Sequence, residues 1–438
     1  MTLKRTIAAL ATGAGRAGVA VLRVSGPAAE ASLAALTGRE GPKPFTAEAR
    51  LFRRPATGEP IDFGLALFMP PPNNYTGEPI AEFMVHGGPA IVASMLDALT
   101  SLPDVRLAEP GEFTRRAFEN GKLDLTKAEA LADLVDAETE GQRRQALRQY
   151  RGALEKRIEG WRRTLIEISA LMEAEIDFPD EEVPEGVAEG ARAKIAHLTG
   201  EFAAFLADAH RGERVREGFR IAIIGAPNVG KSSLLNALAQ REAAIVSDIP
   251  GTTRDVVEVR LVLAGFPVWI ADTAGLREAS DQIEAEGVRR ALERARDADL
   301  RIAVIDGGVS AKALSEVRQG DLVVLNKIDL APPESHGITH RISARTGEGM
   351  PALIATLEAR VVQALGAEEA APLTRARHRA QLEEAHAALL RADQALALGP
   401  ELAAEDVRLA ARALGRLTGR IDVEDILGEI FARFCIGK

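Results

Sequence analysis

The chain has 438 residues, of which 46% are hydrophobic and 27% charged, so it is long enough for about three domains with substantial cores. The net charge of -10 at pH 7 excludes a broadly basic nucleic-acid-binding surface but leaves room for a local basic patch. Cys435 is the only cysteine, which excludes disulfide frameworks and cysteine-based metal sites within one chain.

The first segment, residues 1–119, mixes short apolar runs with turn residues, and this pattern predicts an α+β domain. The expected strands are Val19–Val24, Phe63–Met69 and Ile80–Val85, with a loop at Pro70–Pro72 and a helix at Ile91–Leu99. Met1–Arg5 is not followed by a signal-peptide apolar core, and no run is long enough to span a membrane. We therefore expect a cytoplasmic protein.

Two segments of charged, amphipathic helical pattern flank a different region of the chain. The first segment is residues 120–217, in which Thr126–Arg211 predicts long helices, interrupted near Phe178–Asp180 and Pro184. The second segment is residues 367–438, in which the chain after Pro372 is again helical and charged, through Phe434. Between them, residues 218–366 alternate buried strands and helices, which is typical of an α/β domain. The sequence therefore predicts one α-helical domain, formed by the middle and C-terminal segments, with an α/β domain inserted into it.

The inserted segment opens with a phosphate-binding loop pattern, Gly225-Ala226-Pro227-Asn228-Val229-Gly230-Lys231-Ser232. The apolar run Phe219–Ile224 before it predicts a buried strand, and Ser233–Leu238 after it predicts a helix start. Strand, glycine loop and helix is the arrangement that points backbone N–H groups at phosphate oxygens. Lys231 is expected to reach the β- and γ-phosphates, and the Ser232 hydroxyl to ligate Mg²⁺.

Later motifs in the same segment select the nucleotide. Asn326-Lys327-Ile328-Asp329 follows the apolar run Leu322–Leu325, and the Asp329 carboxylate can accept from two guanine N–H groups that adenine lacks. Asn326 and the Lys327 stem are expected to support the base pocket, and Ser343-Ala344 to form the last base-contacting loop. The order of the motifs therefore predicts GTP rather than ATP.

Two further segments are expected to respond to the γ-phosphate. Asp272-Thr273-Ala274-Gly275 follows the strand-like Val268–Ile270, and there Asp272 can hold Mg²⁺ through water while the Gly275 N–H bonds the γ-phosphate. Asp248-Ile249-Pro250-Gly251-Thr252-Thr253 lies between this motif and the phosphate loop, and Thr253 is the candidate hydroxyl for Mg²⁺. Many GTPases place Gln after the last glycine to orient water, but this chain has Leu276, so another group must do so.

The whole chain resembles the MnmE (also called TrmE) family of bacterial tRNA modification GTPases. Outside the nucleotide motifs, the resemblance is carried by runs spread over nearly the full length: Gly18–Gly26, Tyr75–Glu78, His86–Pro89, Pro110–Phe118, Lys122–Leu125, Ile176–Pro179 and the C-terminal Phe434–Lys438. It implies an N-terminal domain of folate-binding type that also mediates constitutive dimerisation. Arg23, Glu82, Lys122 and Lys438 match positions at the folate site.

The resemblance also assigns roles in hydrolysis. Asn228, Ser247, Ile249 and Thr252 match the residues that hold a K⁺ ion beside the phosphates, where a cation can replace an arginine finger. Glu284 matches the residue that orients the attacking water, and together with Lys231 it is the expected catalytic residue. The expected GTP-binding set is Asn228, Val229, Gly230, Lys231, Ser232, Ser233, Ser247, Asp248, Ile249, Pro250, Gly251, Thr252, Thr253, Asp272, Thr273, Ala274, Gly275, Asn326, Lys327, Asp329, Ser343 and Ala344.

Two features of the sequence each allow two interpretations. Cys435 is either a nucleophile in uridine chemistry or, as we favour, a small apolar residue packing near the folate site. The cluster Arg375, Arg377, His378 and Arg379 is either a tRNA-phosphate patch or, as we favour, the solvated face of a helix.

The expected function is that of a homodimeric GTPase in modification of the wobble uridine of tRNA. The resemblance implies an FAD-containing partner of MnmG type, in a heterotetramer. It also implies 5,10-methylenetetrahydrofolate as one-carbon donor, with 5-formyltetrahydrofolate as a further ligand of the same site. The product would be an aminomethyl or carboxymethylaminomethyl uridine. The alternatives are a regulatory GTPase of ribosome assembly, for which an additional Lys/Arg-rich RNA-binding module would be expected, and a folate-dependent transferase whose nucleotide domain is only regulatory.

Overall fold

The structure, a computed structural model, describes residues 5–177, 187–241, 258–272, 298–306, 317–330, 337–366, 373–421, 424–432, 434 and 437. These residues fall into two compact units, each of which brings together segments that are distant in the sequence. The first unit comprises 1–132, 150–162 and 411–438, and the second comprises 133–149 and 163–410. Within the described residues, no helix combines the length and the apolar character needed to cross a membrane.

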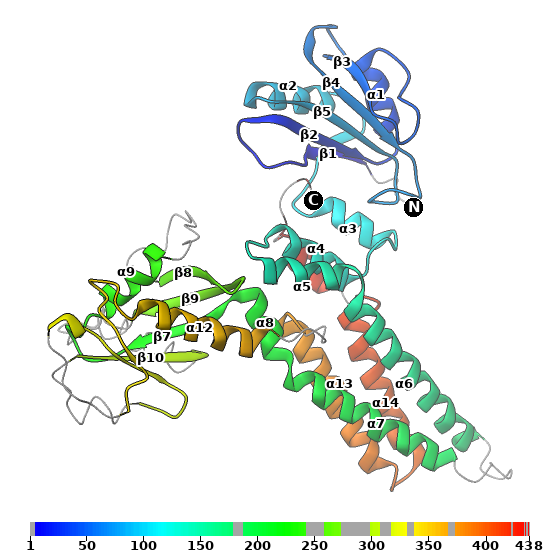
Figure 1. The fold of residues 1–438 in the computed structure, drawn as a ribbon. Coiled ribbons are helices and arrows are strands. Elements are labelled where there is room, and N and C mark those ends of the chain that lie inside the picture. Colours follow the sequence, from blue (N-terminus) through cyan, green and yellow to red (C-terminus); the bar gives the residue numbers. More distant parts are fainter. Residues whose placement is uncertain are drawn as a thin grey trace, which may run out of the picture. The chain divides into compact units, whose positions relative to one another are not determined.

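The first unit is built on a mixed six-stranded sheet of order β3-β4-β5-β2-β1-β6 (Figure 1). Its elements are β1 (Thr6–Leu10), β2 (Ala17–Ser25), α1 (Ala29–Thr37), β3 (Glu48–Arg53), β4 (Pro60–Met69), β5 (Ile80–Gly87), α2 (Pro89–Thr100), β6 (Val105–Leu107) and α3 (Glu112–Glu119). The three strands and the helix expected at Ile91–Leu99 are confirmed, as parts of β2, β4, β5 and α2. β1, β3, β6 and α1 were not anticipated individually.

One face of this sheet carries the core. Alternate residues of the strands point to that face, and Leu22, Phe52 and Phe83 are fully buried there against Leu33 of α1 and Met95 of α2. The rings of Phe52 and Phe83 meet edge to face, with centroids 5.5 Å apart. Both helices therefore cover the same face of the sheet, and neither of them covers the other face of β4, β5 and β2.

A buried ion network joins α3 to this sheet. Arg116 is 4% exposed, and its guanidinium donates to the backbone oxygens of Arg5 and Ser25. It also donates to Glu78 at 3.0 Å and to Glu112 at 2.9 Å. Because two carboxylates and two carbonyls satisfy the buried cation, it ties four stretches of chain together without an unpaired charge.

The helices of the first unit close a second, smaller core. Leu125 and Ala128 of α4 (Leu125–Val135) pack with Leu427 and Phe431 of α15 (Glu424–Ala432) and with Phe434. Gly111 approaches α15 so closely that an added Cβ would lie 2.5 Å from the backbone oxygen of Phe431. The end of the chain is therefore packed against the entry to α3.

The second unit contains four helices that pack on one another and a nucleotide-domain sheet. The four helices are α6 (Ala153–Asp177) from Arg163 onward, α7 (Val187–Ala207), α13 (Ala376–Ala395) and α14 (Pro400–Thr418) up to Ala410. The same unit also contains α5 (Glu140–Tyr150) up to Gln149 and α8 (Ala209–Glu217). Their buried residues include Leu165, Ile195, Phe202, Leu389 and Val407. The predicted helical character of residues 126–211 and of the chain after Pro372 is confirmed, whereas Phe178–Asp180 and Pro184 lie outside the described residues.

The sheet of the second unit has the order β12-β11-β10-β7-β9-β8, with all neighbours parallel except β8 and β9. Its elements are β7 (Phe219–Ile224), α9 (Lys231–Arg241), β8 (Glu258–Leu263), β9 (Phe266–Asp272), β10 (Leu300–Ile305), β11 (Leu322–Leu325), the 3-10 helix Ile328–Leu330, β12 (His340–Arg341) and α12 (Met350–Leu365). The strands expected at Phe219–Ile224, Val268–Ile270 and Leu322–Leu325 are confirmed.

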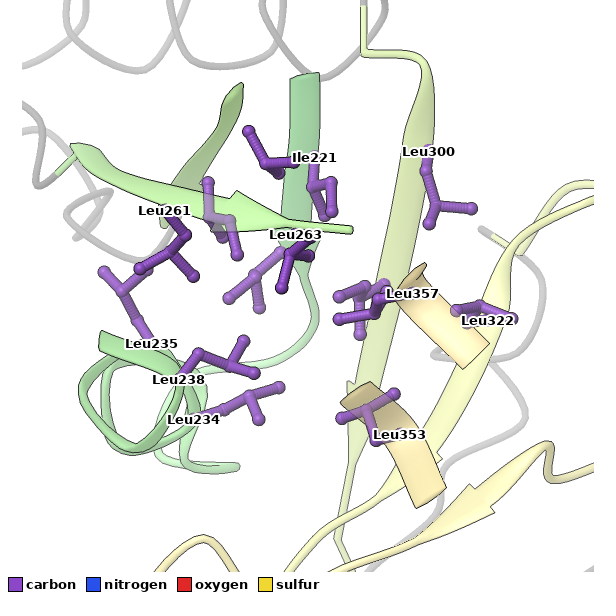
Figure 2. Close-up of a cluster of buried hydrophobic side chains, with 14 of the residues drawn as sticks. Ile221, Leu234, Leu235, Leu238, Leu261, Leu263, Leu300, Leu322, Leu353 and Leu357 are labelled. Carbon is purple, nitrogen blue, oxygen red and sulfur yellow. The ribbon is translucent and has the colours of Figure 1, made fainter. Parts of the chain in front are cut away.

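Leucines of α9 and α12 form the core against this sheet. Figure 2 shows Leu234, Leu235 and Leu238 of α9 directed toward the strands beside Leu353 and Leu357 of α12. All five side chains are at most 1% exposed. The strand order reverses its direction of growth at β7, and in open α/β sheets ligands bind at such a switch point, beyond the carboxyl ends of the strands.

The predicted division into 1–119, 120–217, 218–366 and 367–438 stays a prediction. Its limits lie at or beside the ends of α3, α8 and α12. The fold class, with an N-terminal α+β part, a helical part from the middle and C-terminal segments, and an inserted phosphate-loop α/β part, is that of the described chain.

Candidate functional site

The phosphate loop leaves β7 at its carboxyl end and enters α9 at Lys231. Gly225 has φ 143°, and an added Cβ would lie 2.2 Å from the Val304 carbonyl oxygen of the neighbouring strand β10. Asn228 takes the left-handed conformation with φ 64°. A non-glycine residue in that region is uncommon and marks a constrained turn. The loop therefore has the tight path that the motif requires.

Lys231 is placed at the centre of this loop. Its side chain is buried, and Nζ donates to the carbonyl oxygens of Gly225 at 2.8 Å and Ala226 at 2.7 Å. Ser232 and Ser233 follow in the first turn of α9, where backbone N–H groups and the helix dipole favour an anion. The register pairs Ile223 of β7 with Asp272 of β9, so the predicted Mg²⁺-organising residue ends its strand beside the loop.

The base-reading loop is bonded directly to the phosphate loop. Asn326 is 3% exposed; its Nδ2 donates to the Val229 carbonyl oxygen at 3.0 Å, and its Oδ1 accepts from the Ala344 N–H at 3.0 Å. Gly230 lies against the same amide, because an added Cβ would be 2.2 Å from Asn326 Nδ2. Lys327, with φ 62°, donates to the Asn228 carbonyl oxygen at 2.6 Å and to Asp306 at 3.0 Å.

Asp329 is held by two donors from the last loop. Ser343 Oγ donates to one carboxylate oxygen at 2.7 Å, and Arg345 donates to the other through Nε at 3.1 Å. The hydrogen bond from Ser343, followed by that from Arg345, lowers the pKa of Asp329 below its ordinary value. The carboxylate is therefore ionised at neutral pH, and its two oxygens have capacity for two more donors. The structure thus brings Asn326, Lys327, Asp329, Ser343 and Ala344 together with the phosphate loop.

Many of the predicted nucleotide-site residues lie outside the described residues. They are Ser247, Asp248, Ile249, Pro250, Gly251, Thr252, Thr253, Thr273, Ala274, Gly275 and Glu284. The backbone of Asp272 is described as the end of β9, whereas its side chain lies outside the described part of the structure. The roles assigned to these residues stay predictions.

A second cluster of predicted site residues lies in the N-terminal domain. Arg23 of β2 and Glu82 of β5 are paired in the strand register, and Arg23 Nε donates to Glu82 Oε1 at 2.8 Å. The guanidinium lies 5.4 Å from the Tyr75 ring centroid and 5.8 Å from that of Phe113. These distances are typical of cation–π contacts. Lys122 donates to the Pro72 carbonyl oxygen at 2.7 Å and lies beside Gly77. Lys438 and Cys435 lie outside the described residues.

Sequence reasoning did not find the aromatic support of Arg23. Tyr75 was noted only as part of a family motif, yet its hydroxyl bonds Thr114 Oγ1 at 2.7 Å and its ring lies beneath the cation. The sequence did contain a signal for Tyr75, because it is one of only two tyrosines in the chain and lies within a run of turn residues. Tyr75 is thus a further member of this cluster.

The predicted basic cluster at the start of α13 is largely engaged within the second unit. Arg375 donates to Asp133 at 2.7 Å, Arg379 donates to Glu213 at 3.1 Å, and His378 is 1% exposed. Arg377 also makes an internal interaction. The favoured interpretation, a solvated helix face, is therefore wrong for His378, which is buried, and for Arg375, which is ion-paired and mostly buried. The alternative, contact with tRNA, is untested.

The tyrosine beneath Arg23 gives a pH test of the N-terminal cluster. Burial raises the pKa of Tyr75 to about 12, outweighing the hydrogen bond from Thr114 and the charge of Arg23. Because the folded pKa is raised, this group's contribution to stability is complete below about pH 10 and is lost as the pH rises towards about 12. We expect an absorbance titration of phenolate to resolve a component with a midpoint near that value.

Two single variants separate the tyrosines in this titration. Tyr75→Phe should remove the late component, and Tyr150→Phe should leave it in place. A late component that persists in Tyr75→Phe would contradict the assignment.

Two family models match most of the chain. Residues 6–122 match the family model described as "GTP-binding protein TrmE N-terminus", and residues 125–435 match that of the "MnmE helical domain". The G domain of the T. maritima FeoB iron transporter is a structural match with 27% identity and a TM-score of 0.26, covering 33% of this chain and 98% of that one.

Curated relatives match the chain from end to end. The "tRNA modification GTPase MnmE" of Parvibaculum lavamentivorans is 58% identical over 99% of this chain and 100% of its own length. The protein of the same name from Maricaulis maris is 54% identical over 100% of this chain and 100% of its own length. The one from Caulobacter vibrioides is 54% identical over 99% of this chain and 99% of its own length. The chain therefore belongs to the MnmE family of tRNA modification GTPases.

Proposed function

We propose that this protein hydrolyses GTP in a cycle that serves the modification of the wobble uridine of certain tRNAs in the cytoplasm. The observation that carries the proposal is the Asn326 side chain, which bonds the phosphate loop through Val229 and the base loop through Ala344. This bridge fixes the distance between phosphate recognition and Asp329. The relatives' name, tRNA modification GTPase, supplies the process.

Guanine is selected by the ionised carboxylate of Asp329. One carboxylate presents two acceptor oxygens, and the guanine N1–H and exocyclic amino group present two donors side by side. Ser343 and Arg345 hold the carboxylate in place from its other side. Adenine would present an acceptor to one of these oxygens, so that oxygen would lose its hydrogen-bond donor. The site is therefore a guanine pocket.

The phosphate loop fits a Mg²⁺-bound triphosphate. Lys231 Nζ is already held over the loop by two carbonyl oxygens, and Ser232 begins the first turn of α9. Ser232 and Thr253 would hold Mg²⁺, which neutralises the phosphate charge when bound. Lys231 orients the β- and γ-phosphates, and the N–H groups of the loop and of α9 receive their oxygens.

Hydrolysis in this site needs a group other than Gln to orient water, since residue 276 is Leu. We assign that role to Glu284 and assign Asn228, Ser247, Ile249 and Thr252 to a K⁺ ion. Of these only Asn228 lies in the described chain, and its left-handed backbone turns the phosphate loop. K⁺ supplies positive charge where negative charge develops.

Two changes test this assignment: replacement of K⁺ by Na⁺ in the buffer, and replacement of Glu284 by Ala. Hydrolysis should fall at least about tenfold when Na⁺ replaces K⁺, because loss of one stabilising charge typically costs a few kcal/mol of transition-state binding. Glu284→Ala should slow the chemical step with GTP affinity unchanged, whereas Glu286→Ala serves as the neighbouring control. Equal rates in both salts would rule out the K⁺ site.

The exposed face of the N-terminal sheet supports a homodimer. Phe63 and Leu65 of β4 are 61% and 41% exposed, and they lie on the face opposite to α1 and α2. The register places Leu51 beside Phe63 and Met84 beside Leu65. A contiguous apolar patch on a sheet is typical of an interaction surface. We propose that two copies of this chain pair through it.

A charge placed on that face should break the dimer. Phe63→Asp puts an unpaired carboxylate into the proposed contact, so sedimentation equilibrium should show a monomer where the unaltered protein is a dimer. Leu398→Asp, at a residue 79% exposed in the helical part, should leave the dimer intact. A dimeric Phe63→Asp protein would refute the proposed face.

The N-terminal cluster fits a folate one-carbon donor in its chemistry. Glu82 offers an acceptor pair for a pterin edge, and Arg23 and Lys122 offer cations for a glutamate tail. Lys438 would complete the pocket, with Cys435 packing near it. We propose 5,10-methylenetetrahydrofolate as the donor, with 5-formyltetrahydrofolate able to occupy the same site. We also propose an MnmG-type FAD protein as partner in a heterotetramer that adds the aminomethyl or carboxymethylaminomethyl group.

Nucleoside analysis of tRNA tests the function as a whole. A strain lacking this gene should lose aminomethylated wobble uridines by mass spectrometry, and the unaltered gene should restore them. Asp329→Asn should not restore them, because its amide donates where guanine also donates. The purified variant should instead hydrolyse xanthosine triphosphate, whose carbonyl replaces the guanine amino group, which shows that it is folded. Unchanged uridines in the deletion strain would sink the proposal.

A further inference from the structure

Two neighbouring strands of the nucleotide-domain sheet end side by side, at the edge from which the phosphate loop also leaves. β10 pairs with β11 in parallel, with Ile305 beside Leu325, and the Asn326 N–H donates to the Ile305 carbonyl oxygen at 2.8 Å. Asp306 follows β10 directly, so it lies at the carboxyl edge of the sheet, where ligands bind in open α/β folds. Asp306 belongs to none of the motifs that predict the nucleotide site.

A lysine connects Asp306 to the phosphate loop. Lys327 Nζ donates to the Asn228 carbonyl oxygen at 2.6 Å and to Asp306 Oδ2 at 3.0 Å. An ammonium group carries three N–H donors, and these two bonds use two of them on partners from different segments of the chain. The ammonium group of Lys327 is thus the link through which Asp306 can act on the phosphate loop.

The two partners of this ammonium group differ in how firmly they are held. Asn228 is an exposed residue of a loop, whereas Asp306 directly follows Ile305, which is 3% exposed at the end of a strand inside the sheet. A lysine side chain is a flexible four-carbon stem that loses rotamer freedom when it is fixed. The Asp306 carboxylate therefore gives the stem an anchor on the rigid part of the domain, and the stem in turn fixes the loop.

Neither folding stability nor charge alone accounts for a carboxylate at this position. The side chains of Lys327 and Asp306 are 35% and 30% exposed, and an ion pair in that much contact with water adds little to the stability of the fold. A negative charge near a site for phosphate groups repels them. A neutral residue at position 306 would therefore tighten nucleotide binding if the charge acted directly, and would weaken it if Asp306 acts by positioning Lys327.

We propose that Asp306 is a positioning residue of the nucleotide site. Its carboxylate fixes the Lys327 ammonium group, which holds the Asn228 carbonyl oxygen, and with it the phosphate loop, in the geometry that receives a guanine nucleotide. A loop that is fixed in advance loses less freedom on binding, so the nucleotide binds more tightly. This role rests on the proposed binding of GTP at the site and adds to it a residue outside the nucleotide motifs.

Calorimetric titration of the full-length protein with GDP in the presence of Mg²⁺ tests this role. Asp306→Asn keeps the size of the side chain and removes its charge. The dissociation constant of GDP should then rise at least about threefold, because a charge-assisted hydrogen bond is about twice as strong as a neutral one. The thermal unfolding midpoint without nucleotide should not change, since the ion pair is partly exposed.

Asp299→Asn is the matched control. Asp299 precedes β10 at the opposite end of the strand and pairs with Arg214 at 2.9 Å, and the side chains of this pair are 21% and 22% exposed. The six residues of β10 extend over about 20 Å, which exceeds the Debye length of about 8 Å at physiological salt. The loss of this charge should therefore leave the affinity for GDP unchanged.

A second background shows whether Lys327 carries the effect. In a Lys327→Met protein, Asp306→Asn should cause no further loss of affinity for GDP, because two changes that remove the same contact do not add. An equal loss in both backgrounds would overturn the positioning role. Unchanged or tighter binding of GDP by the single variant Asp306→Asn would overturn it as well.

The same titrations separate this role from the proposed function. If the unaltered, folded protein binds no GDP, the proposed function fails, and the role of Asp306 fails with it. If the unaltered protein binds GDP and Asp306→Asn binds it equally well, only the role of Asp306 is overturned.

Discussion

The nucleotide site depends on one buried side-chain amide. Asn326 joins β11 to two loops that are far from it in sequence, since its Nδ2 reaches the Val229 carbonyl and its Oδ1 receives the Ala344 N–H. A carboxylate could not donate and a hydroxyl could not span both partners, so only an amide of this length satisfies both. Because phosphate and base are parts of one ligand, fixing the two loops relative to each other preorganises the site and lowers the cost of binding.

The same amide constrains its neighbours. Residue 230 must be glycine, because φ is 95° there and a Cβ would lie 2.2 Å from Asn326 Nδ2. Lys327 takes a left-handed backbone immediately after the bridge, which directs its amine to the Asn228 carbonyl oxygen. The backbone of Asn228 is therefore held by a lysine that follows another strand, β11. A loop positioned in this way presents its groups with little freedom, which is what a site for developing charge requires.

The local parts of this site could be predicted from sequence, and the long-range parts could not. A phosphate loop is written in consecutive residues, since its glycines, its lysine and the flanking strand and helix are local features. The bond from Asn326 to Val229 spans 97 positions, and no period or composition indicates it. The buried network of Arg116 was missed for the same reason, because its partners Arg5, Ser25 and Glu78 lie in separate segments.

The hairpin of β8 and β9 connects the nucleotide site to helical residues of the second unit. Its register pairs Glu258 with Ala271, so β8 begins and β9 ends at the same edge of the sheet. At the opposite edge, Gly141 donates its N–H to the Gly265 carbonyl oxygen at 2.9 Å, with no space for a Cβ beside Phe266. Trp269 in between donates to the Glu217 carbonyl oxygen at 2.7 Å, beneath the Arg260 guanidinium.

A hairpin held at its turn and at its middle cannot shift alone. A displacement imposed at Glu258 or Asp272 must either bend the two strands or move α5 and α8 with them. Packed interiors resist continuous deformation, so the second response is favoured. Residues of α5 and α8 are thus mechanically part of the nucleotide domain, because their contacts with Gly265 and Trp269 connect them to both strands of the hairpin.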